Sequence, residues 1–129
     1  MLSKPSRAPR DRVLIVDQSE DSREVLRTAL ERRGVQTLEA SGARQGIELA
    51  RQHHPRVIVL DLEADAAADE HVQAQYDAES KEHDARLVVL GRTARYERTL
   101  PKDRIVSKPY HYAPLIRTIE RLLGTSARI

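Results

Sequence analysis

The chain has 129 residues, with 22 Lys and Arg against 20 Asp and Glu, and it contains no Cys. This length allows one domain of ordinary size. The absence of Cys excludes disulfides, thiolate nucleophiles and Cys-ligated zinc, and no apolar run approaches the roughly 18 residues of a membrane span. With no Phe, no Trp and four Tyr, the core must be aliphatic. We expect a soluble, cytoplasmic protein with no membrane contact.

The formal net charge of +2 conceals a regional segregation. Lys and Arg counted against Asp and Glu give +3 for residues 1–12, 0 for 13–60, −8 for 61–84 and +7 for 85–129. Because the acidic stretch offsets the basic ones, the small positive surplus is a weak indication of nucleic-acid binding. The pattern favours a protein partner selected by charge.

The first strand and helix follow from simple patterns. Residues 1–12 carry two Pro and no hydrophobic period, so we interpret them as a flexible basic arm without the apolar stretch of a secretory signal. Residues 13–16 form a continuous aliphatic run that ends at Asp17, which is typical of a strand buried on both faces of a parallel sheet. Apolar residues at helical spacing over 25–30 predict a helix that Gly34 stops.

The middle of the chain repeats this order. Residues 35–40 alternate in polarity and predict a strand nearer an edge, and Ser41 is the expected cap of a second helix. The apolar run 57–60 predicts a buried strand that again ends at an aspartate, Asp61. A third helix is expected within residues 66–83, where large apolar residues are few and Val72 and Tyr76 are its best anchors.

Two strands remain. Residues 87–90 form an apolar strand followed by Gly91, and a strand beginning at 105 leads to a last amphipathic helix that Gly124 ends. Only a short fourth helix fits between these strands. The alternation of strands and helices predicts an α/β fold, with a doubly wound parallel sheet covered by helices on both faces. Ligands of such a sheet bind at the carboxyl ends of its strands.

The residues at those ends form an ordered set. The segments VLIVD ending at Asp17, VIVLD ending at Asp61, and Ser107-Lys108-Pro109 resemble, at these separations, the receiver domain of two-component response regulators. Each motif alone is common, but the set across residues 12–123 is specific. The resemblance implies a flavodoxin-like, five-stranded sheet of order 2-1-3-4-5 in a domain over residues 13–124, with a tail at 125–129.

The resemblance also implies a chemistry. Asp61 is then the phosphoacceptor, which takes a phosphoryl group from a histidine kinase or phosphotransfer protein, so the chain is not an enzyme in the usual sense. Lys108 contacts the carboxylate and the phosphoryl group, and the bond to Pro109 is cis. Mg²⁺ is held by Asp17, by Asp61 and by the backbone carbonyl of Glu63.

Several positions depart from the family pattern. Gln18 replaces the second acid of the metal-binding pair, which weakens the Mg²⁺ site, although Glu20 or Asp21 could reach it. Gly91 stands where the family has the hydroxyl that reads the phosphoryl group, and Ile105 replaces the coupled aromatic residue. With the fourth helix shortened, the face where the family forms homodimers or binds partners should be reshaped and basic.

Two functions stay open at this point, and a third is disfavoured. The chain is a receiver that accepts phosphate on Asp61 weakly or conditionally, or a degenerate receiver that docks a downstream protein target without phosphorylation. An unrelated nucleotide-binding protein is disfavoured because no glycine-rich phosphate loop follows the first strand. The five histidines show no metal-ligand spacing beyond the pair His53 and His54, and Tyr110 and Tyr112 are interpreted as packing residues of the last helix.

Overall fold

The structure is a computed structural model that describes residues 12–124, so residues 1–11 of the arm expected at 1–12 and the tail expected at 125–129 lie outside the described residues. Five parallel strands form one sheet in the order β2-β1-β3-β4-β5, and the expected α/β fold with this strand order is confirmed. The strands are β1 (Arg12–Val16), β2 (Gln36–Ala40), β3 (Val57–Asp61), β4 (Arg86–Leu90) and β5 (Ile105–Val106).

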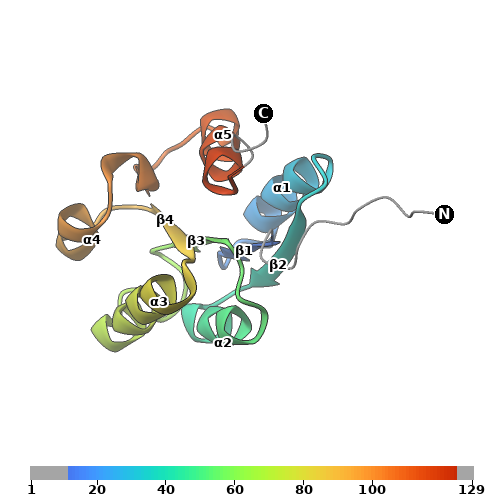
Figure 1. Cartoon of the computed structure of the whole chain (residues 1–129). Coiled ribbons are helices and arrows are strands. Elements are labelled where there is room, and N and C mark those ends of the chain that lie inside the picture. Colours follow the sequence, from blue (N-terminus) through green and yellow to red (C-terminus); the bar gives the residue numbers. More distant parts are fainter. Residues whose placement is uncertain (1–11, 125–129) are drawn as a thin grey trace.

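Helices cover both faces of the sheet. They are α1 (Glu20–Glu31), α2 (Ala43–His53), α3 (Glu70–His83), α4 (Ala94–Thr99) and α5 (Tyr112–Leu122), with a 3-10 turn η2 (Lys102–Arg104) before β5. Figure 1 shows α1 and α5 on one face, and α2, α3 and α4 on the other. The fourth helix has six residues, as the short connection predicts. None of the helices in the described part is long and apolar enough to cross a bilayer.

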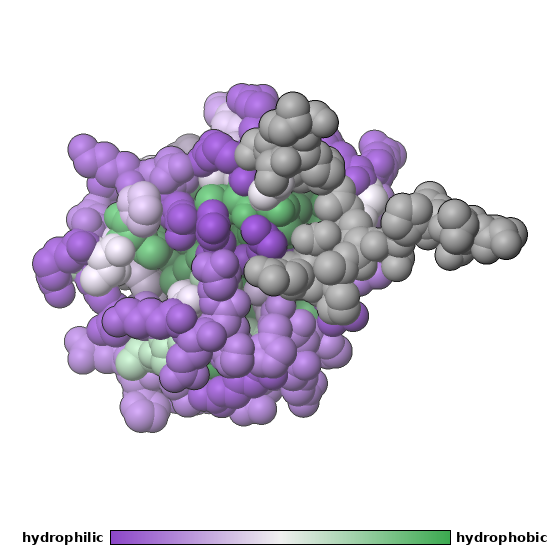
Figure 2. Space-filling model, viewed as in Figure 1, coloured by the Kyte–Doolittle hydropathy of each residue, from purple (hydrophilic) through white to green (hydrophobic). Residues whose placement is uncertain are grey.

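The core has two halves, one on each face of the sheet, and both are mainly aliphatic. The α1 and α5 side packs Leu26, Leu30 and Ile119 against the sheet. The α2 and α3 side packs Ile47, Val72 and Tyr76 against the other face, so the two expected anchors of α3 are confirmed. Burying one such side chain stabilises the fold by about 1.5–3 kcal/mol. Figure 2 shows hydrophilic residues over most of the visible surface and hydrophobic ones mainly between the helices.

Two sequence-based boundaries differ from the structure. Arg12, placed in the arm, belongs to β1 and pairs with Gln36 of β2. Ser41 is not the cap of α2: the N-cap is Gly42, which makes no side-chain hydrogen bond. The physical reason is that the backbone N–H of Ala43 already donates to the carbonyl oxygen of Asp65 at 2.8 Å, so the loop after β3 satisfies this helix end.

The opposite charges of α3 and α4 partly neutralise each other. Arg95 of α4 lies 2.5 Å from Asp77 of α3, and Arg44 of α2 lies 3.2 Å from Asp69 at the start of α3. The first of these pairs joins the acidic stretch 61–84 to the basic stretch 85–129, and both pairs are partly exposed to solvent. This pairing leaves a weaker charge contrast for a partner than the sequence suggested.

Strand register positions the candidate site. The central strands β1 and β3 are neighbours, with Val16 paired to Leu60. Asp17 directly follows Val16 and Asp61 directly follows Leu60, so the two carboxylates lie side by side at the carboxyl edge of the sheet. A shift of one residue would turn one carboxylate away from the other.

Candidate functional site

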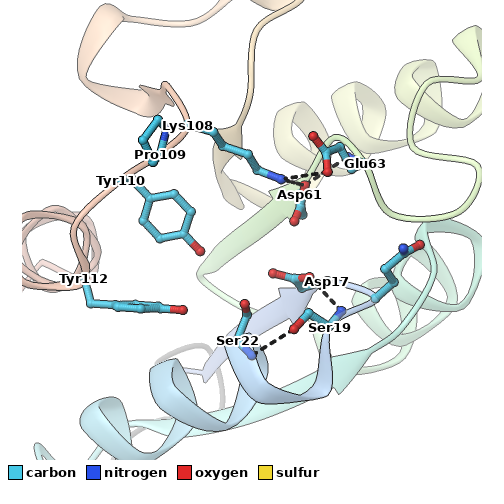
Figure 3. A pocket seen from close by; sticks show the side chains of 10 residues that line it. Asp17, Ser19, Ser22, Asp61, Glu63, Lys108, Pro109, Tyr110 and Tyr112 are labelled. Carbon is cyan, nitrogen blue, oxygen red and sulfur yellow. Dashed lines mark hydrogen bonds and ion pairs between the residues drawn. The ribbon is translucent and has the colours of Figure 1, made fainter.

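A pocket of about 580 Å³ opens at the carboxyl edge of the sheet. The loops after β1, β3 and β5 and the start of α1 form its walls (Figure 3). The lining residues are Asp17, Gln18, Ser19, Ser22, Asp61, Glu63, Lys108, Pro109, Tyr110 and Tyr112. The structure thus brings together six residues that the sequence singled out for this site, from three separate segments.

Asp61 and Lys108 form the central contact of the pocket. The ammonium Nζ of Lys108 donates to Asp61 Oδ1 at 2.7 Å, and the backbone N–H of Glu63 donates to the same oxygen at 2.9 Å. Burial lowers the pKa of Lys108, but the hydrogen bond and the attraction of Asp61, together with Glu63, outweigh it and raise that pKa above its ordinary value. The Lys108–Pro109 peptide bond is cis.

The two carboxylate oxygens of Asp61 have different surroundings, because the Lys108 ammonium and the Glu63 N–H both donate to Oδ1. Among the described residues, no N–H donor contacts Asp61 Oδ2. The side chain is 9% exposed and faces the pocket. A carboxylate held by one oxygen presents the other to an incoming electrophile.

Asp17 is a buried carboxylate that is repelled by the neighbouring carboxylate of Asp61. Its Oδ1 accepts a hydrogen bond from the backbone N–H of Ser19 at 2.9 Å, which also orients the start of α1. Burial raises the pKa of Asp17, the Ser19 N–H opposes this, and the nearby charge of Asp61 raises it further. Such a pair of adjacent carboxylates is a place where a cation is favourable.

Glu63 contributes more to the pocket than the backbone oxygen that the family resemblance assigns to it. Its carboxylate lies 3.4 Å from Lys108 Nζ, and its side chain is 78% exposed. With Asp17 and Asp61, the pocket holds three carboxylates against one ammonium, a net formal charge of −2. The exposed Glu63 therefore partly offsets the charge lost where Gln18 replaces an acid, which spacing alone did not indicate.

Tyr110 and Tyr112 also line the pocket, a role that the sequence interpretation missed. Their ring centroids are 5.4 Å apart in an edge-to-face arrangement, and both hydroxyls point toward the carboxylates (Figure 3). Both rings also pack against the α1 and α5 half of the core, so the expected packing role holds as well. Burial raises the pKa of Tyr110, and Tyr112 adds to the effect. Their position directly after Pro109 was the available signal.

Gly91 and Ile105 lie outside this pocket. Gly91 has a φ of +119°, and a Cβ added there would lie 3.3 Å from the Leu62 Cβ. Ile105 is partly buried and packs against the α2 and α3 half of the core. The backbone conformation at position 91 therefore favours glycine over any residue with a side chain. A hydroxyl-bearing residue would strain this loop.

The donor set of the pocket fits a hard divalent cation. Asp17 and Asp61 lie next to each other in the pocket, and both are almost fully buried. Carboxylate and carbonyl oxygens are the ligands that Mg²⁺ prefers, and Gln18 adds a neutral amide to the lining. These residues can therefore hold Mg²⁺. The site has one charged ligand fewer than a site with two acids after β1.

Comparison with known proteins finds related sequences and structures but no matching family model. Over 121 residues the chain is 27% identical to the polar-differentiation response regulator DivK of Brucella ovis, which covers 87% of this chain and 95% of that protein.

Two solved structures illustrate the structural likeness. The signal receiver domain of a signal transduction histidine kinase from Syntrophus aciditrophicus aligns with a TM-score of 0.69 and 21% identity, covering 92% of this chain and 94% of that one. The chemotaxis response regulator CheY4 of Vibrio cholerae aligns with a TM-score of 0.65 and 21% identity, over 86% and 97% of the two chains. The fold expected from the motifs is confirmed.

Proposed function

We propose that this chain, which has the fold of the response-regulator receiver domains and aligns with one of them over most of its length, works in two-component signal transduction and accepts a phosphoryl group on Asp61. The observation that carries the proposal is the contact of Lys108 Nζ with Asp61 Oδ1 at 2.7 Å, beside the buried carboxylate of Asp17. The donor is a histidine kinase or phosphotransfer protein.

The chemical step needs a nucleophile and a means of neutralising charge. An oxygen of Asp61 attacks phosphorus, the bond from phosphorus to the donor's nitrogen or oxygen breaks, and the leaving group departs with that electron pair. The product is an acyl phosphate on Asp61. Because both reactants are negative, the ammonium of Lys108 stabilises the charge that gathers on the phosphoryl oxygens.

Mg²⁺ would be held by the carboxylates of Asp17 and Asp61 and by the backbone carbonyl of Glu63, with Gln18 as a weak neutral ligand. When bound, it supplies positive charge to the phosphoryl oxygens. This chain's own contribution is to hold the carboxylates in place, through the N–H groups of Ser19 and Glu63. We propose that labelling is weak or conditional because Gln18 removes one charged ligand.

Intact-mass spectrometry tests the acceptor. The purified chain, incubated with acetyl phosphate and Mg²⁺, should gain one phosphoryl group slowly and incompletely, and Asp61→Asn should gain none. Asp65→Asn, which changes an exposed aspartate in the same loop, is the matched control and should label like the unchanged chain. Rapid stoichiometric labelling would contradict the weak acceptor, and undiminished labelling of Asp61→Asn would contradict the assignment of Asp61.

The alternative function is a docking module that needs no phosphorylation. The conformation of Gly91 favours it, since its φ of +119° strains any residue that could carry the hydroxyl through which the family reads the phosphoryl group. The adjoining surface of α4 and η2 carries Arg98 and Lys102, which make no ion pair within the described residues and could contact an acidic partner or a second copy.

Beryllofluoride, a mimic of the phosphoryl group, separates the two functions. For a docking module, amide NMR resonances of residues 92–106 should not move when beryllofluoride and Mg²⁺ are added. Movement of these resonances that Asp61→Asn abolishes would support a phosphorylation-dependent receiver and rule out the docking module.

A further inference from the structure

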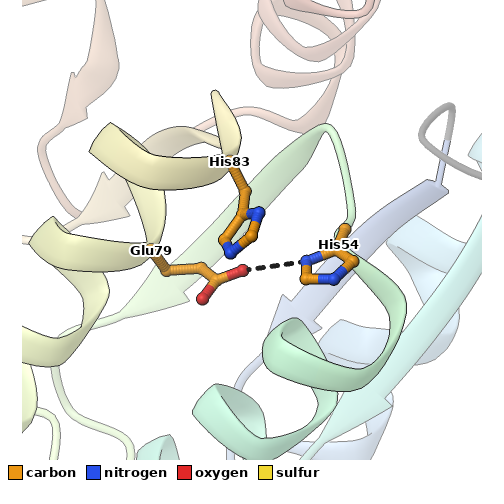
Figure 4. Close-up of side chains that lie close together, drawn as sticks. All are labelled: His54, Glu79 and His83. Atoms are coloured by element: carbon orange, nitrogen blue, oxygen red, sulfur yellow. Dashed lines mark hydrogen bonds and ion pairs between the residues drawn. The ribbon is translucent and has the colours of Figure 1, made fainter.

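A second cluster of ligand-type side chains lies at the other edge of the sheet. His54 caps the C-terminus of α2, and Glu79 and His83 stand four residues apart on α3, so they share one face of that helix. Figure 4 shows the two imidazoles and the carboxylate converging. No metal-ligand spacing in the sequence predicts this cluster, because His54 is 25 residues away from Glu79 and only the packing of α2 on α3 brings them together.

The cluster lies apart from the pocket that contains Asp61, which we call the acceptor pocket. His54 leads through two residues into the first residues of β3, and His83 leads into the first residues of β4. The cluster therefore lies at the amino edge of the parallel strands, whereas Asp17 and Asp61 lie at the carboxyl edge. None of the three side chains of the cluster takes part in the phosphoryl chemistry proposed for the pocket.

The distances match those of a metal site. One ligand atom from each of the three side chains can be chosen so that all lie within 4.8 Å of one another. The His54 Nδ1 and Glu79 Oε2 atoms are 3.3 Å apart, and the two ring centroids are 4.2 Å apart. Zinc bonds of about 2.0–2.1 Å separate neighbouring ligands of a tetrahedral site by roughly 3.4 Å. The His54 and Glu79 pair already has this separation, and His83 needs only a small side-chain movement.

Burial of Glu79 calls for a cation. Its side chain is 5% exposed, and within the described residues its one ion-pair partner is His54, with no Lys or Arg beside it. Burying a carboxylate is costly unless a compensating charge or several hydrogen bonds meet it. A contact of 3.3 Å is long for a hydrogen bond, so this partner compensates the charge poorly.

Access and chemistry suit a transition-metal ion. The side chain of His54 is 49% exposed and His83 is exposed as well, so an ion can enter from solvent and keep a water ligand. Two imidazoles with one carboxylate favour Zn²⁺ over Mg²⁺ or Ca²⁺, which prefer oxygen ligands.

We propose that His54, Glu79 and His83 bind one Zn²⁺ ion, with a fourth position open to water or to a ligand from a partner. The ion joins the end of α2 to the last turns of α3. Helix α3, which follows the loop after Asp61, carries few large apolar residues and is therefore weakly held by packing. The metal link would add to its stability. Binding requires neutral imidazoles, so the zinc affinity falls as the pH is lowered.

Zinc titration of the chain, without any affinity tag, tests the proposal by calorimetry and by the shift in Tm. The variants are His83→Ala, Glu79→Gln and His54→Asn, since Asn tolerates the φ of +48° found at His54. His71→Ala removes an exposed histidine at the other end of α3 and is the matched control. All titrations are repeated in an Asp61→Asn background, which keeps zinc bound at the acceptor pocket from being counted.

In the Asp61→Asn background, we expect one equivalent of Zn²⁺ and a raised Tm both without a further change and with His71→Ala. Each of the three ligand variants should lose affinity by roughly tenfold or more, since loss of an outer-shell partner alone costs about 10–100-fold. Circular dichroism without zinc shows whether each variant is folded. Folded ligand variants that bind zinc as tightly as His71→Ala would overturn the proposal, and so would an unchanged chain that binds none.

Discussion

Lys108 Nζ lies 2.7 Å from Asp61 Oδ1 and joins two segments 47 residues apart in the chain. Asp61 ends a buried strand, whereas Lys108 stands in the loop after β5, so the contact exists only when the sheet is assembled. It places one ammonium group among three carboxylates. This balance of charge decides how the pocket treats both a phosphoryl group and a divalent cation.

Replacing Lys108→Met should separate those two effects. Methionine keeps the length of the side chain but removes its charge, so labelling of Asp61 by acetyl phosphate should fall by a factor on the order of 10². The affinity for Mg²⁺, measured by calorimetry, should rise because three carboxylates then stand without an ammonium. Lys102→Met, an exposed lysine of η2, is the control. Equal labelling of the two variants would show that Lys108 has no part in the transfer.

Restoring the second acid by Gln18→Asp should tighten Mg²⁺ binding. A further charged oxygen ligand raises the affinity of such sites, and we expect a gain on the order of tenfold, with faster labelling. Gln52→Asp adds the same charge at an exposed position of α2 and should change neither. If the gain is absent at position 18, Glu63 or another group already supplies the missing charge.

The raised pKa of Asp17 gives a pH-dependent stability. Burial first, and then the charge of Asp61, favour the protonated carboxyl in the folded state, so stability is lost as the pH rises from the ordinary value of 3.8 through the raised pKa. Without divalent cations, Asp17→Asn should therefore unfold at a higher urea concentration than the unchanged chain at pH 7, and the difference should shrink toward pH 4. Asp21→Asn, in the exposed first turn of α1, should show no such gain.

Magnesium provides a second readout of the same residue. It should raise the Tm of the unchanged chain more than that of Asp17→Asn, because one carboxylate ligand is missing in the variant. Equal stabilisation of both would mean that Asp17 does not contact the cation.

Gly91→Thr introduces the hydroxyl that the family has at this position. The variant should nevertheless not accept phosphate on Asp61 any faster. The φ of +119° and the 3.3 Å approach to Leu62 strain any larger residue, so the free energy of unfolding should fall by about 1–3 kcal/mol without faster labelling. Gly42→Ser is the control, since its added Cβ meets Asp65 no closer than 3.6 Å and Ser suits an N-cap. A stable Gly91→Thr variant would show that this loop can take another conformation.

Two buried tyrosines form a matched pair for stability. The hydroxyl of Tyr76 donates to the carbonyl oxygen of Ala43 at 2.7 Å, whereas the buried hydroxyl of Tyr96 contacts no hydrogen-bond partner in the described part of the chain. Tyr76→Phe should lower the free energy of unfolding by about 0.5–1.5 kcal/mol, because the hydrogen bond from the hydroxyl to the Ala43 carbonyl oxygen is lost. Tyr96→Phe should be neutral or stabilising. Urea titrations that rank the two variants in the opposite order would contradict this assignment.

Local patterns were sufficient for most of the fold. The aliphatic runs that end at Asp17 and Asp61 need burial on both faces, which a parallel sheet with helices provides. The cap of α2 could not be predicted in the same way. Ser41 has the right side chain, but the carbonyl oxygen of Asp65, far along the chain, satisfies the helix end at Ala43 instead.

The sequence by itself determined the strands, the helices and the acidic and basic residues that end the strands, because hydrophobic periodicity and chain length act locally. Tertiary structure alone decided which further side chains join those that the strand-end motifs predict to converge. It placed Glu63 and the two tyrosines around Asp61, made Gly91 a conformational requirement, and gathered His54 with Glu79 and His83. These groupings depend on strand register and helix packing, which arise from contacts between distant segments and have no signature within any one of them.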